Sequence, residues 1–96
     1  PRGLLEYAGI LAEMNHADSA VTVLEAGVQR HAEDPEMWAA YFGFLWNLAT
    51  DLPAAHAGIQ QSWLRFGTPF QEALAAFYPL ANADPVVALI WSQPRA

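Results

Sequence analysis

Apolar residues recur along this chain with the spacing of amphipathic helices. Residues 18–31 carry one stripe with a period near 3.6, formed by Ala20, Val23, Leu24, Gly27 and Val28. Similar stripes occur in residues 35–49 and 53–66, and no segment alternates with period two for long enough to predict a strand. The pattern predicts six helices, at about 3–14, 18–31, 35–49, 53–66, 69–81 and 85–92, and an all-α fold.

Three proline dipeptides predict where helices begin. In Asp34-Pro35-Glu36 the aspartate is a candidate N-cap, the proline suits the first helical position, and the acid favours the positive end of the helix dipole. Asp84-Pro85 has the same form. Thr68-Pro69 is read in the same way, with a capping box completed by Gln71.

Other residues predict where helices end or bend. Gly67 is a candidate left-handed C-cap, and Asn15 and Asn82 are less specific stop signals. Pro79 falls inside the fifth predicted helix, where the missing N–H group should produce a kink.

The prolines and alanines also repeat over a longer distance. Pro1, Pro35 and Pro69 are separated by steps of 34 residues, and Ala20, Ala54 and Ala88 keep the same step. A period of this size predicts an array of helix pairs, in which each pair buries its apolar face against its neighbours.

With these residues the chain resembles the tetratricopeptide repeat family. The resemblance is carried by Leu4, Tyr7, Ala8, Leu11, Ala20, Leu24 and Gly27 in the first repeat and by Trp38, Tyr41, Leu45 and Ala54 in the second. Gly58 and Gln61 depart from it, because they leave the second helix of this repeat without the usual apolar residues. It implies a right-handed array of about three antiparallel helix pairs in one domain, with repeats at about 1–34, 35–68 and 69–96. Phe42 departs from the pattern, which prefers a small residue there, so we expect the second pair to splay or shift register. The third repeat is degenerate.

The resemblance also implies a concave groove lined by the first helix of each pair. The residues expected to bind a partner are Gly9, Glu13, Gly43, Trp46, Asn47, Phe77, Leu80 and Trp91. Gly9 and Gly43 would leave room for a partner backbone, Trp46 would be a binding residue, and Trp91 would be an exposed anchor. Leu5, Gly9, Ala39, Gly43 and Ala73 stand where some relatives carry a basic clamp for a chaperone's carboxylate, which disfavours that function. For any single aromatic residue, a place in the core remains the alternative.

Composition narrows the classes of partner. The net charge is −6, without lysine, so an acidic surface disfavours nucleic acid. No apolar run reaches the length of a membrane span. Pro1 is not an initiator Met, so we expect the chain to be part of a longer one. A soluble protein is expected, with the cytoplasm slightly favoured.

Candidate chemistry is sparse. His16, His31 and His56 have spacings that fit no helical metal pair. Glu33, Asp34 and Glu36 form an acidic cluster beside His31, and capping explains Asp34 and Glu36 without catalysis. No nucleophile motif or phosphate loop occurs, so we expect no cofactor, no metal site and no enzymatic activity.

We therefore predict a non-catalytic scaffold that binds a protein partner, with self-association as a homodimer left open. An apolar groove suits a partner helix or peptide. Two alternatives remain: an all-α cofactor-binding or catalytic bundle that uses the His and Trp residues, and a structural segment that caps a longer solenoid.

Overall fold

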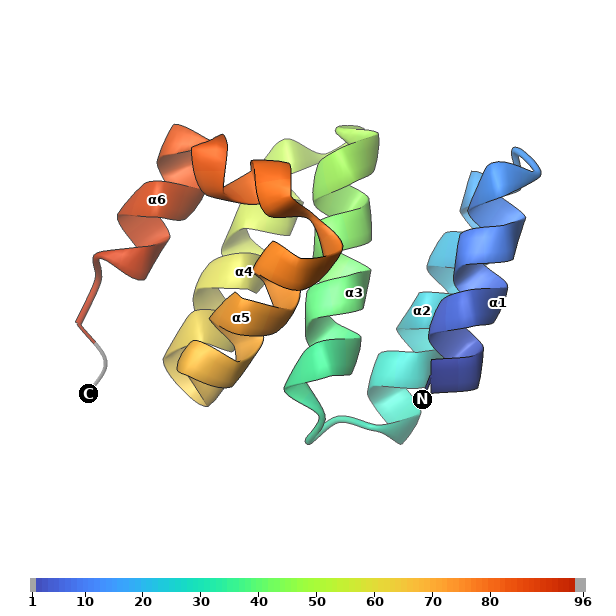
Figure 1. Cartoon of the computed structure of the whole chain (residues 1–96), viewed down its shortest axis with the longest axis horizontal. Coiled ribbons are helices and arrows are strands. Elements are labelled where there is room, and N and C mark those ends of the chain that lie inside the picture. Colours follow the sequence, from blue (N-terminus) through green and yellow to red (C-terminus); the bar gives the residue numbers. More distant parts are fainter. Residues whose placement is uncertain (1, 95–96) are drawn as a thin grey trace.

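The structure, a computed structural model, describes residues 2–94 and consists of helices throughout this range (Figure 1). The elements are α1 (Arg2–Glu13), α2 (Ala17–Arg30), α3 (Pro35–Leu48), α4 (Leu52–Phe66), α5 (Thr68–Phe77), the short 3₁₀ helix η1 (Pro79–Ala83) and α6 (Pro85–Trp91). No strand occurs among the described residues. The all-α prediction is confirmed, and α1 to α4 match the predicted ranges to within one residue.

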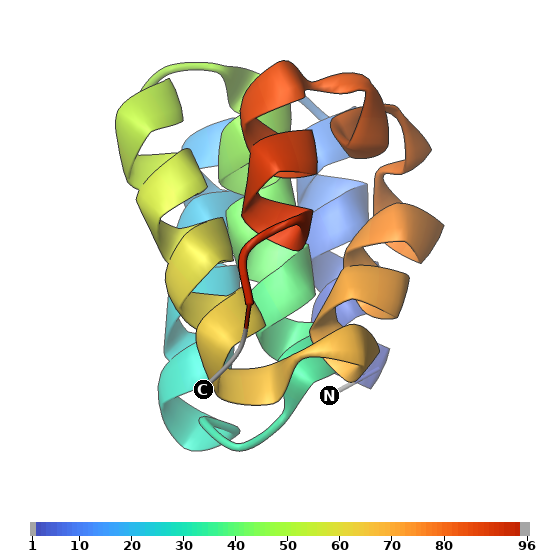
Figure 2. The ribbon, with the colours of Figure 1, turned by 90° about the vertical axis from the view of Figure 1, so that its left-hand side faces the viewer.

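Helix α3 is the centre of the array. α2 packs on one side of it, α4 and α5 pack on the other, and α6 packs against α4 (Figures 1 and 2). The α1/α2 and α3/α4 pairs are helical hairpins that lie side by side, and the first hairpin and α6 lie at opposite ends of the 38 Å long axis. The third pair is more open, because α6 contacts α4 and η1 more closely than it contacts α5.

Two apolar clusters hold these layers together, and α3 contributes to both. Ala40 and Phe44 of α3 join Ala8, Ala20 and Leu24 of the first hairpin. The other cluster lies between α3 and the C-terminal helices and contains Ala39, Ile59, Phe70, Leu74, Ala81, Val87 and Ile90. A helix with apolar residues around most of its surface is expected at the middle of such an array.

In the second hairpin the large residue lies on the first helix and the small residue on the second, which is the reverse of the first hairpin. In the first hairpin Ala8 of α1 is small and Leu24 of α2 is large, and both are buried. In the second, Phe42 of α3 is large and its ring lies directly over Gly58 of α4, in the space that a Cβ atom would need. Gly58 therefore accommodates Phe42, and α3 and α4 remain closely packed along their length instead of splaying.

Two of the three predicted N-caps are confirmed. The Asp34 carboxylate accepts a hydrogen bond from the Glu36 amide at 3.0 Å, and Asp84 accepts one from the Val86 amide at 2.8 Å. The Thr68 capping box is wrong, because α5 already begins at Thr68 and the Gly67 carbonyl accepts the first amide hydrogen bonds. Asp51, which was not predicted, caps α4 through the Ala54 amide.

The predicted kink at Pro79 is also wrong, because α5 ends before it. Tyr78 has φ −136° and ψ 76°, as expected for a residue that precedes proline and avoids the helical region. Pro79 then begins η1, and Asn82 lies within η1 instead of closing a long α-helix. Gly67 and Asn15 have the positive φ angles, 72° and 64°, expected at helix ends, although the ψ of Gly67, −138°, lies outside the left-handed helical region.

Candidate functional site

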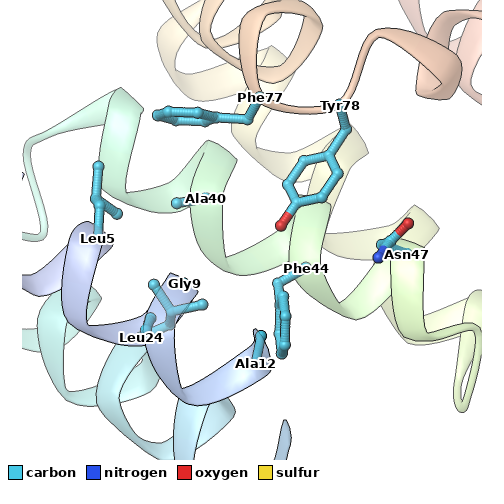
Figure 3. Close-up of a pocket in the computed structure, with 10 residues that line it drawn as sticks. Leu5, Gly9, Ala12, Leu24, Ala40, Phe44, Asn47, Phe77 and Tyr78 are labelled. Carbon is cyan, nitrogen blue, oxygen red and sulfur yellow. The ribbon is translucent and has the colours of Figure 1, made fainter. Parts of the chain in front are cut away.

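A groove lies between α1 and α3 and is closed at one side by the C-terminal end of α5 (Figure 3). Its volume is about 320 Å³, and its lining residues are Leu5, Ala8, Gly9, Ala12, Leu24, Ala40, Phe44, Asn47, Phe77 and Tyr78. Most of these side chains are apolar. The groove exists because α1 packs on α2, and α2 on α3, so the α1 and α3 backbones are not in close contact.

After Leu5, the wall contributed by α1 consists of three small residues, Ala8, Gly9 and Ala12. Ala8 is buried, and Gly9 and Ala12 lie on the side that faces the groove (Figure 3). A Cβ atom built on Gly9 would meet no atom within 4 Å, so this part of the wall is open to the surroundings. Small residues on a helix allow another chain to approach its backbone closely.

Tyr78 closes the groove because the helix breaks at this residue. Its ring packs on Gly43 of α3, in the space that a Cβ atom there would need. The hydroxyl group points into the groove and has no hydrogen-bond partner among the described residues (Figure 3). Burial of the ring raises the pKa of the hydroxyl above its usual value, so it remains a neutral donor and acceptor near neutral pH.

The two ends of the groove differ in polarity. Asn47 and the Tyr78 hydroxyl lie at the end near the C-terminus of α3 (Figure 3). At the other end a second hollow continues from the groove, shares Leu5 and Phe77 with it, and is otherwise lined by Glu6 and Glu36. Among residues 3–94, no arginine or histidine side chain lines either hollow.

The residues that form most of this groove match a known family. Residues 1–42, which include α1, α2 and the first half of α3, match the family model of the tetratricopeptide repeat. Over these 42 residues the chain is similar to the tetratricopeptide repeat family. No curated protein and no solved structure gives a significant match. Tetratricopeptide repeats generally mediate protein–protein interaction and are typically non-catalytic. Within residues 2–94, no helix combines the length and the apolar character that crossing a bilayer requires.

Several of the partner-binding residues predicted from the repeat pattern line the groove. Gly9, Asn47 and Phe77 do so, and 38% of the Phe77 surface is exposed. Glu13, at the end of α1, is exposed but lies outside the lining. Leu80 is 76% exposed on η1, also outside it, because the break at Pro79 carries the chain away from α3.

Gly43, Trp46 and Trp91 do not line the groove, although the repeat resemblance implied that Gly43 and Trp46 would. Gly43 is buried and offers no space to a partner, because Tyr78 of the same chain covers it. Trp46 packs on the C-terminal apolar cluster, and its indole N–H donates to Asp84 at 2.8 Å. Trp91 is half-buried against the Trp63 ring, and its N–H donates to Asn82 at 2.8 Å, so it is not an exposed anchor.

Asp84 is the centre of a polar cluster that sequence reasoning missed. One carboxylate oxygen accepts from the Trp46 indole and lies 2.8 Å from Nε2 of His56, and the other accepts from the Val86 amide. Desolvation by itself would raise the pKa of Asp84, but these hydrogen bonds and the nearby imidazole lower it to about 2. The cluster ties α6 to α3 and α4. Its members are far apart in sequence, so no local motif predicts it.

The remaining polar residues have structural explanations. Glu33 pairs with Arg65 of α4 at 2.8 Å, and Trp38 donates to the Ala32 carbonyl at 2.8 Å. His31 is the residue at which α2 ends. No group of three potential His, Cys, Asp or Glu metal ligands lies together in the described part of the chain.

Proposed function

We propose that this tetratricopeptide-repeat-like chain is a non-catalytic scaffold that holds a helix of a protein partner in the groove between α1 and α3. The observation that carries the proposal is the open apolar groove beside Gly9, whose α1 side consists of Leu5 and the small residues Ala8, Gly9 and Ala12. Side chains of a partner helix would enter the groove and bury apolar area against Leu24, Phe44 and Phe77.

The polar groups at the end of the groove fit the same occupant. The Tyr78 hydroxyl has no hydrogen-bond partner among the described residues and can donate to, or accept from, a polar residue of the bound helix. A buried apolar contact with a few polar groups at its edge is the usual composition of a protein interface. The groove of about 320 Å³ is large enough for one or two partner side chains, so neighbouring surface must supply the rest of the contact.

Two glycines of α1 provide a matched test. In both Gly9→Trp and Gly3→Trp the new Cβ atom meets no atom within 4 Å, but only Gly9 lines the groove. Peptides of about 18 residues, long enough to form a helix when bound, would be selected from a displayed library on the unmodified chain. Their affinities for the two variants would then be measured by fluorescence anisotropy.

We expect Gly9→Trp to weaken the selected peptides at least about tenfold, because the indole fills the groove, and Gly3→Trp to leave their affinity nearly unchanged. Circular dichroism would check that both variants are helical. Equal affinity for both variants, or failure to select any peptide, would contradict the proposal.

Self-association is a second candidate, favoured by apolar side chains at the two ends of the array. Tyr7, Ile10 and Met14 form a stripe on α1 with exposures of 53%, 53% and 60%, and Leu89 of α6 is 67% exposed at the opposite end. A second copy could stack its α6 end on this stripe and continue the array. Sedimentation equilibrium should then show a concentration-dependent oligomer that Ile10→Glu abolishes. A monomer at all concentrations would refute this candidate.

A further inference from the structure

The acidic hollow beside the groove specifies the kind of partner. We infer that the occupant is an amphipathic helix that places apolar side chains in the groove and a lysine or arginine, about one turn away, between Glu6 and Glu36. This inference rests on the proposed function and adds to it the charge of the partner. Sharing Leu5 and Phe77, the two hollows form one continuous surface with an apolar part and an anionic part.

The two carboxylates are free to bind a cation. Glu6 and Glu36 are both exposed, and neither forms an ion pair or hydrogen bond through its side chain with another of residues 3–94. They belong to different helices, α1 and α3, and line the same hollow. Other acids have local partners: Glu33 binds Arg65, and Asp34 caps α3. The Glu6 and Glu36 carboxylates have no such partner among residues 3–94.

The dimensions fit one short helical segment. Residues 5 to 12 of α1 follow the groove from the acidic hollow to its far end, and eight helical residues span about 10–12 Å. A partner helix lying along this length presents residues i, i+3 or i+4, and i+7 to it. The first would be the basic residue, the next an apolar residue opposite Gly9, and the last a polar residue near Asn47 and the Tyr78 hydroxyl.

The charge of the whole chain favours the same partner. The net charge is −6, so a cationic helix is attracted before contact, whereas an anionic surface such as nucleic acid or an acidic lipid headgroup is repelled. Specific contact at the hollow and this general attraction predict different effects of mutation. The long-range attraction of the cationic helix to the chain weakens equally whichever acidic residue is neutralised. The contact at the acidic hollow is lost only when Glu6 and Glu36 are neutralised.

Two designed peptides provide the probe. Both have the same apolar helical face and a fluorescent label, and they differ only in carrying lysine or glutamate at the flanking position. Their affinities would be measured by fluorescence anisotropy at about 50 mM and about 300 mM salt. The chain would be tested unmodified, as Glu6→Gln/Glu36→Gln, and as the control Asp18→Asn/Glu25→Gln. The control removes the same charge from α2, outside both hollows.

We expect the lysine peptide to bind the unmodified chain about tenfold more tightly than the glutamate peptide at low salt, which corresponds to two partly exposed ion pairs. This preference should fall to less than about threefold in Glu6→Gln/Glu36→Gln and persist in the control. Equal affinity of the two peptides, or equal loss of preference in both double variants, would overturn the inference.

The Gly9→Trp variant separates failure of this inference from failure of the proposed function. If both peptides bind equally and Gly9→Trp abolishes their binding, the groove is the site and the charge assignment is refuted. If neither peptide binds, or if Gly9→Trp leaves binding unchanged, both the groove proposal and the inference built on it are refuted.

Discussion

The contact between Phe42 and Gly58 offers the sharpest test of how the second helix pair is held together. A Cβ atom at Gly58 would overlap the Phe42 ring, which is stacked on Trp38 with ring centroids 5.6 Å apart. Replacing a helical glycine by alanine ordinarily stabilises a helix by about 0.5–1 kcal/mol. Overpacking a close contact costs about 1–3 kcal/mol. We therefore expect Gly58→Ala to lower the free energy of unfolding by about 1 kcal/mol.

A double-mutant cycle isolates this contact. Phe42→Ala alone should cost about 2 kcal/mol, less than the 3–5 kcal/mol of a fully buried phenylalanine, because the side chain is only half-buried. In Phe42→Ala/Gly58→Leu the large residue moves to α4, the arrangement that Ala8 and Leu24 already have in the first pair. The double variant should be more stable than the sum of the single changes by about 1–3 kcal/mol.

Urea denaturation followed by circular dichroism would measure the four proteins of the cycle, which are the unmodified chain, Phe42→Ala, Gly58→Leu and the double variant. Gly58→Ala would be measured beside them, with Gly9→Ala as its control. Gly9 is also helical but has open space at its Cβ position, so Gly9→Ala should be stabilising. A Gly58→Ala variant as stable as Gly9→Ala, or a cycle in which the changes simply add, would refute the claim that these two residues are fitted to each other.

Three further predictions concern other parts of the fold. Because the folded pKa of Asp84, about 2, lies below its usual 3.8, the ionised carboxylate stabilises the fold above pH 3.8, and this is lost as pH falls toward 2. Asp84→Asn should therefore cost about 1–2 kcal/mol at pH 7 and much less at pH 2, and a pH-independent cost in urea titrations would contradict this. Trp46→Phe should cost about 1–2 kcal/mol, since the N–H donor to that carboxylate is lost, but leave peptide affinity unchanged; weakened binding without destabilisation would return Trp46 to the partner surface. Ala49→Gly should raise the melting temperature by several degrees, because Ala49 ends α3 with φ 59°, and a lower melting temperature would count against this backbone conformation.

The helix order could be predicted from sequence because its signals are local. Asp34 and Asp84 each precede proline, and each carboxylate reaches an amide two residues ahead without help from the rest of the fold. Thr68 also precedes proline, but there the backbone of Gly67 accepts the amide hydrogen bonds. The dipeptide alone does not distinguish these two outcomes.

The candidate site was only partly predictable, because it depends on how helices lie relative to one another. Helix phase places Gly9 and Asn47 on the groove side. Helix phase does not reveal that α5 ends before Pro79, so that the Tyr78 ring packs on Gly43. The aromatic residues of α3 could line a groove or pack in a core, and the sequence does not distinguish these two positions for Trp46. In the structure its indole N–H donates to Asp84, a contact over 38 residues that no local pattern predicts.

The most direct test of the central claim is a ¹⁵N–¹H NMR titration of the labelled chain with the lysine-flanked helical peptide. The account predicts that the largest amide shifts fall on the groove, at Gly9, Ala12, Asn47 and Phe77, with further shifts at Glu6 and Glu36. Shifts confined to the exposed stripe of Tyr7, Ile10 and Met14, or to α6, would place the partner outside the groove and contradict it.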